Sequence, residues 1–263
     1  MTLRRRPRLT PSSRARRALQ LGVVLLLGAA AGRLSPVVVR PPLVLGQDAA
    51  YPGAAGTARV TLERAPQPFI NIEPRGRAAG TLLVFYGGGL VRPQAYEWLG
   101  RALAARGVQT VIPVFPLDLA VTGANRAGSL IGRFGAGKRV VLAGHSLGGA
   151  VAAGYAAEQG SSLSGLVLLA AYPARNVDLR AAPFPVLSLL AGRDGVAAAE
   201  DVRGGLDRLP LGTTLTVLPG AVHAFFGRYG PQRGDGLPDV TREQTEREIV
   251  RAVGGFLDTL PPR

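Results

Sequence analysis

The 263-residue chain contains no cysteine, a single lysine (Lys138) and only two histidines, His145 and His223. Without cysteine, the chain can form neither disulfides nor thiolate metal sites. The scarcity of histidine is more useful for function, because a reaction that needs an imidazole as its base has only two candidates.

Acidic residues are absent from residues 1–46, which contain nine arginines. The rest of the chain carries 22 basic and 17 acidic side chains, so most of the formal net charge of +14 belongs to the N-terminal segment. No run of basic and aromatic residues elsewhere is typical of a nucleic-acid platform. We therefore expect no nucleic-acid partner.

The N-terminal arginines lead into an apolar run over residues 18–32 that ends in small residues. This pattern is typical of a signal peptide, with Ala29 and Ala31 as an A-x-A cleavage site. Arg16 and Arg17 would suit a twin-arginine signal.

Two other interpretations of this segment remain open. The run is shorter than the roughly 20 residues of a membrane span, but an uncleaved anchor is one alternative. A basic tail followed by a core helix is the other. We interpret residues 1–46 as an export signal or membrane anchor plus linker, which allows membrane association. Positive charge before the run predicts a domain outside the cytoplasmic membrane of a bacterium.

From residue 57 onward, runs of strand length alternate with stretches of helix length. Residues 59–63 and 69–72 alternate apolar and polar side chains, as antiparallel strands do. The later apolar runs are continuous, as in buried parallel strands. Further strands are expected at 81–86, 108–112, 139–143, 166–170, 186–190 and 214–218, and helices at 93–106, 119–134, 150–158, 197–209 and 241–260. Residues 57–263 are thus predicted to be one α/β domain, a doubly wound and mostly parallel sheet with helices on both faces.

Residues 144–149 read Gly-His-Ser-Leu-Gly-Gly and lie between an expected strand and an expected helix. G-x-S-x-G in that context is the nucleophile-elbow motif. Gly144 and Gly148 lack the Cβ atoms that would clash in so sharp a turn, and the turn exposes the Ser146 hydroxyl. A glycine-rich turn whose serine merely caps the helix is the alternative.

A serine nucleophile needs a base and a carboxylate that orients it. His145 adjoins Ser146 and should point to the other side of the turn, which leaves His223, in a loop after the last strand, as the base. Of the acids between Ser146 and His223, only Asp194 directly follows an apolar strand. The order Ser146, Asp194, His223 is the order of α/β-hydrolase triads.

The oxyanion of an acyl-transfer intermediate needs two backbone N–H donors. Leu147, the residue after the nucleophile, is one candidate. Gly88 and Gly89 lie in the glycine loop after the expected strand 81–86 and are candidates for the second donor.

These motifs resemble the α/β-hydrolase superfamily. Residues 85–91, 113–120 and 223–236 are similar to a bacterial branch near the dienelactone-hydrolase-like group, whose members often have an N-terminal membrane or export segment. The resemblance spans about residues 57–260. Dienelactone hydrolases proper have cysteine where Ser146 stands, so the resemblance implies the fold and mechanism more firmly than lactone chemistry.

The sequence predicts a serine hydrolase that cleaves a small-molecule acyl ester through an acyl-enzyme, with no metal or organic cofactor. Two alternatives stay open. An amidase, peptidase or thioesterase could use the same triad, and a non-catalytic surface binding protein could share the scaffold. Residues 225–238 could form either a wall of the site or a surface loop.

Overall fold

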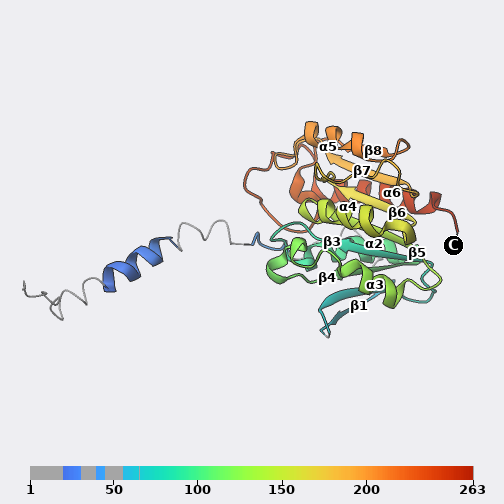
Figure 1. Ribbon diagram of the computed structural model, residues 1–263, viewed down its shortest axis with the longest axis horizontal. Coiled ribbons are helices and arrows are strands. Elements are labelled where there is room, and N and C mark those ends of the chain that lie inside the picture. The colour runs from blue at the N-terminus through green and yellow to red at the C-terminus, as the bar shows by residue number, and fades with distance from the viewer. Residues whose placement is uncertain (1–19, 31–39, 45–55, 65, 263) are drawn as a thin grey trace, which may run out of the picture. The chain divides into compact units, whose positions relative to one another are not determined.

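The computed structural model describes residues 20–30, 40–44, 56–64 and 66–262 (Figure 1). The chain divides at residue 40 into two compact units. In the first unit, residues 20–30 are helical with exposed side chains. Among the described residues, no helix has both the length and the apolar character needed to cross a bilayer. Of the two alanines of the proposed cleavage site, Ala29 lies in this helix and Ala31 lies outside the described residues.

The second unit is built on one eight-stranded sheet in the order β1-β2-β4-β3-β5-β6-β7-β8. The first two strands pair antiparallel with each other, and β2 also pairs antiparallel with β4. All remaining neighbours pair parallel. The strands are β1 Ala58–Glu63, β2 Phe69–Pro74, β3 Thr81–Tyr86, β4 Val108–Pro113, β5 Arg139–His145, β6 Gly165–Leu169, β7 Val186–Ala191 and β8 Thr214–Leu218. The predicted fold class is confirmed.

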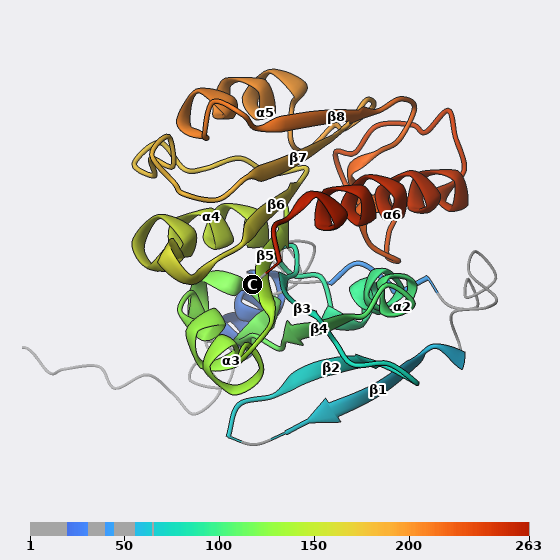
Figure 2. The same cartoon turned by 90° about the vertical axis from the view of Figure 1, so that its right-hand side faces the viewer.

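Helices cover both faces of this sheet. Figure 2 shows α3, α4 and α5 on one side and α2 and α6 on the other. Their bounds are α2 Glu97–Ala104, α3 Arg126–Phe134, α4 Leu147–Gln159, α5 Ala199–Gly205 and α6 Arg242–Thr259. Each face has its own apolar core, and the side chains of β3, β5 and β6 contribute alternately to the two cores. A sheet buried on both faces explains why these strands are continuously apolar.

The helix expected over 119–134 is shorter in the structure and begins later. Two 3-10 turns, Pro116–Asp118 and Ala120–Gly123, precede a shorter α3. The Tyr86 hydroxyl accepts a hydrogen bond from the Ala127 N–H at 2.7 Å and donates to the Ala124 carbonyl at 2.7 Å. Because this buried hydroxyl binds an N–H of the first helical turn, it acts as a cap at the start of α3.

Parallel topology fixes where a site can lie. The carboxyl ends of β3 to β8 all meet at one edge of the sheet, which we call the carboxyl edge. In open α/β sheets, ligands bind outside that edge. Ser146, Asp194 and His223 follow β5, β7 and β8, so the topology brings all three to the carboxyl edge.

Candidate active site

Ser146 occupies the turn between β5 and α4 in a strained backbone conformation. Its φ is 52° and its ψ is −125°, a region that residues other than glycine rarely adopt. Such a conformation costs about 1–3 kcal/mol and persists where the surrounding structure enforces it. Here the turn is anchored at its start, because the Ser146 N–H donates to the Leu169 carbonyl at 3.0 Å.

The glycines of the motif are required by close backbone approach. A Cβ on Gly144 would lie 2.5 Å from the Gly148 carbonyl oxygen, and a Cβ on Gly148 would collide with the carbonyls of Tyr86 and Gly87. The first turn of α4 therefore packs directly on its own strand and on the end of β3. The geometry matches the strand–turn–helix expected of a nucleophile elbow.

Asp194 and His223 form a buried hydrogen-bonded pair. His223 Nδ1 lies 2.8 Å from Asp194 Oδ2, and the two side chains are 1% and 0% exposed. The other carboxylate oxygen, Oδ1, accepts the N–H groups of Val196 at 2.8 Å and Ala197 at 2.7 Å. The carboxylate is thus fixed by the backbone of its own loop, and it holds the imidazole with a proton on Nδ1.

The second ring nitrogen of His223, Nε2, is not engaged by Asp194. Nε2 is buried and has no hydrogen-bond partner among the described residues. Its ring lies 4.5 Å, centroid to centroid, from the ring of His145, the residue that precedes the nucleophile. No hydrogen bond joins Ser146 Oγ to this nitrogen within the described part of the chain, and such contacts often tighten only when substrate binds.

His145 is held in a buried network through its Nδ1, whereas its Nε2, like that of His223, is buried with no hydrogen-bond partner among the described residues. Its Nδ1 lies 2.9 Å from the Tyr96 hydroxyl, which also accepts the Gly88 N–H at 2.8 Å. Burial, followed by the neighbouring His223, lowers the pKa of His145 well below its usual value, whereas the His223 backbone acts in the opposite direction. Burial also raises the pKa of Tyr96, so a protonated phenol donates to a neutral imidazole.

This network separates the two glycines proposed as oxyanion donors. The Gly88 N–H is occupied by Tyr96. Gly89 lies against the residue after the nucleophile, since a Cβ built on it would be 3.0 Å from Leu147 Cδ2. Leu147 is the first residue of α4, where backbone N–H groups have no partner within the helix. The Gly89 and Leu147 amides are therefore the pair that remains for an oxyanion.

Asp235 is a residue that the sequence analysis missed. Its Oδ1 accepts the N–H groups of His223 at 2.9 Å, Gly236 at 2.9 Å and Gly195 at 3.3 Å. Its Oδ2 accepts the Ala224 N–H at 2.8 Å. One carboxylate therefore joins the loop of the base to the loop of Asp194. The sequence signal was the acid between two glycines, Gly234 and Gly236, but its partners could not be inferred.

Replacing Asp235 with asparagine is expected to lower kcat by about 10–100-fold, since small misplacements of a reacting group cost that much. Asparagine keeps one acceptor and presents an NH2 group to a backbone N–H that now has no acceptor. The measurement is ester hydrolysis with the melting temperature recorded in parallel. Asp239→Asn is the matched control, because Asp239 lies in the same loop but makes an exposed ion pair with Arg193. Equal losses in the two variants would contradict a positioning role for Asp235.

Two arginines anchor the rest of the loop that carries His223. Arg228 forms a buried, bidentate pair with Glu246 of α6, at 2.9 and 3.0 Å. Arg242 donates to the backbone carbonyls of Ala224, Gly227 and Tyr229, and burial lowers the pKa of Arg242. Together with Asp235, these contacts fold residues 223–236 onto α6 and onto the Asp194 loop. The segment is thus packed on the domain, but none of its residues lines the cleft at Ser146.

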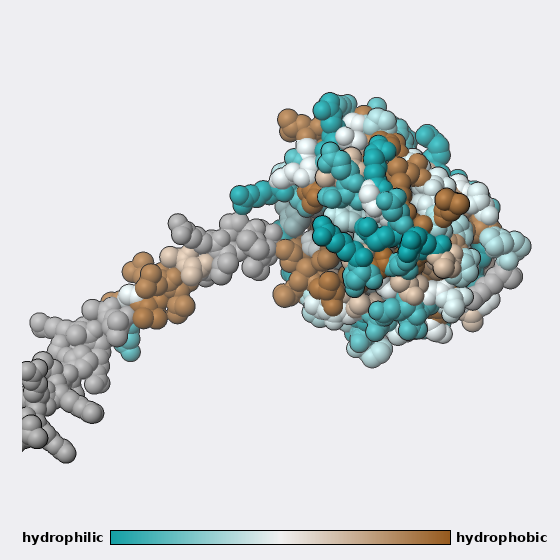
Figure 3. All heavy atoms as spheres, turned by 45° about the horizontal axis from the view of Figure 1, so that its top comes forward, coloured by the Kyte–Doolittle hydropathy of each residue, from teal (hydrophilic) through white to brown (hydrophobic). Residues whose placement is uncertain are grey.

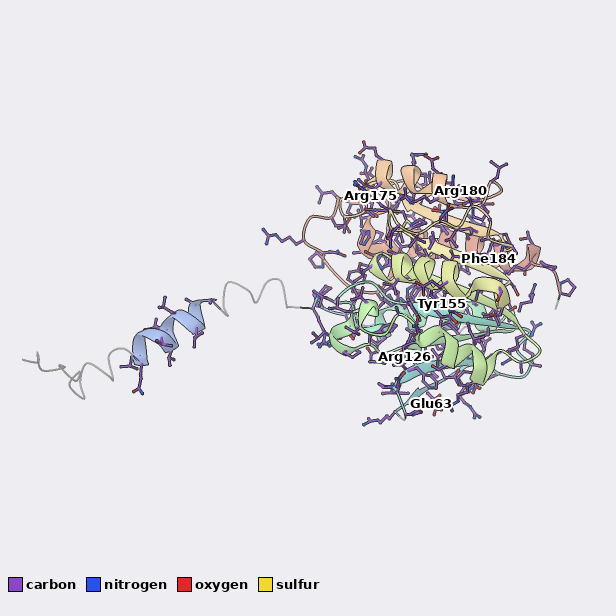
Figure 4. All side chains as sticks on the ribbon, in the orientation of Figure 1. Glu63, Arg126, Tyr155, Arg175, Arg180 and Phe184 are labelled. Atoms are coloured by element: carbon purple, nitrogen blue, oxygen red, sulfur yellow. The ribbon has the colours of Figure 1, made fainter. Side chains whose placement is uncertain are left out.

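A cleft of about 280 Å³ opens at Ser146. Its lining is mainly apolar and comes from the elbow and the loops after β6 and β7, including Ser146, Leu147, Tyr172 and Val196. A hollow of about 320 Å³ lies at the other end of α4, beside Phe184 (Figure 4), but no triad residue lines it. In the described part of the chain, no cluster of three or more His, Asp or Glu side chains is arranged to hold a metal ion.

Comparisons with known proteins bear on the fold. Residues 82–247 match the family model of the alpha/beta hydrolase family, and the chain belongs to that family. The match spans Ser146, Asp194, His223 and Asp235.

Solved hydrolase structures share the fold. One is a predicted CIB-like hydrolase from Thermoplasma acidophilum, 14% identical with a TM-score of 0.59, covering 77% of this chain and 100% of that one. Another is an alpha/beta hydrolase enzyme from a sediment metagenome of the Mar Chica lagoon, Morocco, 13% identical with a TM-score of 0.56, covering 76% and 98%. No curated protein matches the chain. Likeness at this identity extends to the fold alone.

Proposed function

We propose that this hydrolase cleaves acyl esters through a Ser146–His223–Asp194 triad and an acyl-enzyme intermediate. The single observation that carries the proposal is the buried pair of Asp194 and His223, whose free Nε2 lies beside the residue preceding the strained Ser146. A carboxylate that holds a proton on Nδ1 leaves Nε2 as the acceptor, which is the arrangement of a general base.

In the first half of the proposed reaction, Ser146 Oγ attacks the ester carbonyl and its proton passes to His223 Nε2. The negative charge that forms on the carbonyl oxygen is held by the Leu147 and Gly89 amides. Donors of this kind are each worth about 10²–10³ in rate. Collapse of the intermediate breaks the bond to the alcohol, which leaves with the proton from Nε2, and the acyl group stays on Ser146.

In the second half, water attacks the acyl-enzyme. His223 Nε2 removes a proton from that water, the acid product leaves, and the proton returns to Ser146 Oγ. Asp194 stays ionised throughout and stabilises the imidazolium formed in each half.

The direct test is active-site labelling of the purified full-length chain with a fluorophosphonate, together with hydrolysis of p-nitrophenyl esters of rising acyl length. We expect one label per chain, on Ser146, and saturable ester hydrolysis. A chain that neither reacts with the probe nor hydrolyses any of these esters would favour a non-catalytic binding protein. Hydrolysis of the corresponding anilides at higher kcat/KM than the esters would favour an amidase.

We also propose that the domain acts outside the cytoplasmic membrane, either released or anchored. The support is the order of a basic segment, an apolar helix over residues 20–30 and the hydrolase domain. N-terminal sequencing of the mature protein distinguishes release from anchoring, because cleavage would leave a new N-terminus near residue 32.

A further inference from the structure

The carboxyl edge carries an unusual share of exposed apolar side chains. The described part of the second unit exposes seven large apolar residues, and four of them follow the carboxyl ends of parallel strands. Leu117 (63% exposed) and Val121 (57%) follow β4, Val196 (42%) follows β7 and Leu237 (86%) follows β8. Val196 also lines the cleft at Ser146. These four side chains are spread along the carboxyl edge, from the loop after β4 to the loop after β8.

Basic side chains accompany these apolar residues. Arg92, Arg175 and Arg233 are exposed and follow β3, β6 and β8, and none of them forms an ion pair within the described residues. Figure 4 labels Arg175 in the loop that follows β6. The acids nearest Leu117 and Leu237 are already engaged, since Asp118 pairs with Arg40 and Asp239 pairs with Arg193.

Asp118, the residue after Leu117, is influenced by two arginines. Arg40 and Arg92 both act on the Asp118 carboxyl and oppose the rise in its pKa that burial causes. Arg40 pairs directly with this carboxylate, and Arg92 acts on it without forming an ion pair among the described residues. On the far side of the cleft, the exposed acids Glu200 and Asp201 at the start of α5 reduce the positive charge.

The N-terminal segment joins the domain at this same edge. Residues 40–44 run along residues 228–230, with the Val44 N–H donating to the Arg228 carbonyl and the Gly230 N–H donating to the Pro42 carbonyl, both at 3.0 Å. Leu43 forms a β-bridge with Tyr229, and Arg40 pairs with Asp118. Figure 3 shows that apolar atoms are also exposed on the surface of the domain.

The length of chain between the apolar helix and the domain limits how far the domain can lie from that helix. Ten residue steps separate the end of the apolar helix at residue 30 from Arg40, which is at most about 35 Å of fully extended chain. If the N-terminal segment is retained and held at a bilayer, the covalent connection keeps Arg40 within that distance of residue 30.

We propose that the carboxyl edge docks on a bilayer surface that carries anionic lipids, with Leu117 and Leu237 entering the interface. Ser146 then acts on acyl esters held in that surface. The substrate part of this inference rests on the proposed esterase function, whereas the docking part does not. Arginines beside apolar side chains are the combination that binds anionic membranes.

The absence of cysteine allows a clean test. Single variants Leu117→Cys and Leu237→Cys of the full-length chain are labelled with nitrobenzoxadiazole, whose fluorescence rises and shifts to the blue in an apolar environment. Leu211→Cys is the matched control, because Leu211 is fully exposed and lies before the amino end of β8, at the opposite edge. On vesicles of phosphatidylglycerol and phosphatidylcholine, we expect a severalfold rise at 117 and 237 and none at 211.

Three outcomes would overturn the docking proposal. Equal changes at all three positions would mean non-specific adsorption. No change at 117 while the chain sediments with the vesicles would mean that the N-terminal segment binds alone. A change that appears without vesicles as protein concentration rises would mean that a second copy of the chain covers the edge. Vesicles of phosphatidylcholine alone should give a weaker response, which tests the role of charge.

Measurements of ester hydrolysis distinguish the docking of the domain on vesicles from the reaction at Ser146. Leu117→Asn keeps a residue that tolerates the positive φ of 56° at this position, and Leu211→Asn is its control. We expect Leu117→Asn to hydrolyse soluble p-nitrophenyl acetate as the wild type does, but to lose about tenfold on a long-chain ester embedded in the anionic vesicles. If the wild type hydrolyses neither ester while the label at 117 responds, the esterase proposal fails and docking stands.

Discussion

Replacing Ser146 with alanine is expected to lower kcat for p-nitrophenyl ester hydrolysis by about 10⁵–10⁶-fold, the loss typical of removing a triad nucleophile. Without Oγ, no covalent acyl-enzyme can form. Only the oxyanion donors and substrate binding then contribute to catalysis. That remainder still gives about 10³–10⁴ over the uncatalysed reaction. The measurement is steady-state hydrolysis at saturating ester concentration, alongside fluorophosphonate labelling, which should disappear.

The fold should survive this change, which makes the result interpretable. Alanine has the same Cβ as serine, so the strain at φ 52° is unaltered. The Ser146 N–H keeps its bond to the Leu169 carbonyl, and the collisions that require Gly144 and Gly148 are unchanged. An unchanged melting temperature with activity near the wild-type level would mean that Ser146 is not the nucleophile.

Local sequence was sufficient to predict the fold class and the position of the elbow. The strands around β5 are continuously apolar because both faces of the sheet are covered, and that signal is read from neighbouring residues. Gly144 and Gly148 meet backbone atoms, so their role also follows from a local turn. Asp194 and His223 could be selected because each follows a strand of the parallel sheet.

Contacts between residues distant in the chain could not be predicted in this way. The Tyr96 hydroxyl joins Gly88 to His145, which is 49 residues away in sequence, and nothing near Tyr96 marks that partner. This one hydroxyl binds the N–H of Gly88 and not that of Gly89, so it decides which of the two amides is left for an oxyanion. In the same manner, the Tyr86 hydroxyl caps α3 from 41 residues away and shortened the helix expected over 119–134.

Asp194→Asn is the more specific test of the proposed mechanism, with an expected loss in kcat of about 10⁴-fold. Asp194 Oδ1 accepts the backbone N–H groups of Val196 and Ala197, so the amide oxygen of an asparagine should take that place. Its NH2 group then faces His223 Nδ1, in the position of the present Oδ2. A donor there requires Nδ1 to be an acceptor, which moves the imidazole proton to Nε2, and a protonated Nε2 cannot take the proton of Ser146.

Because both backbone bonds to Oδ1 survive in Asp194→Asn, the fold and ester binding should be retained, and the loss should appear in kcat more than in KM. Asp201→Asn is the matched control, since Asp201 is an exposed acid in the first turn of α5. A kcat for Asp194→Asn within tenfold of the wild type would place the orienting carboxylate elsewhere. Asp235 would then be the next candidate, because it binds the His223 backbone, although it makes no bond to the ring. A loss confined to Asp194→Asn would instead show that the tautomer of His223, and not only the position of its loop, determines the rate.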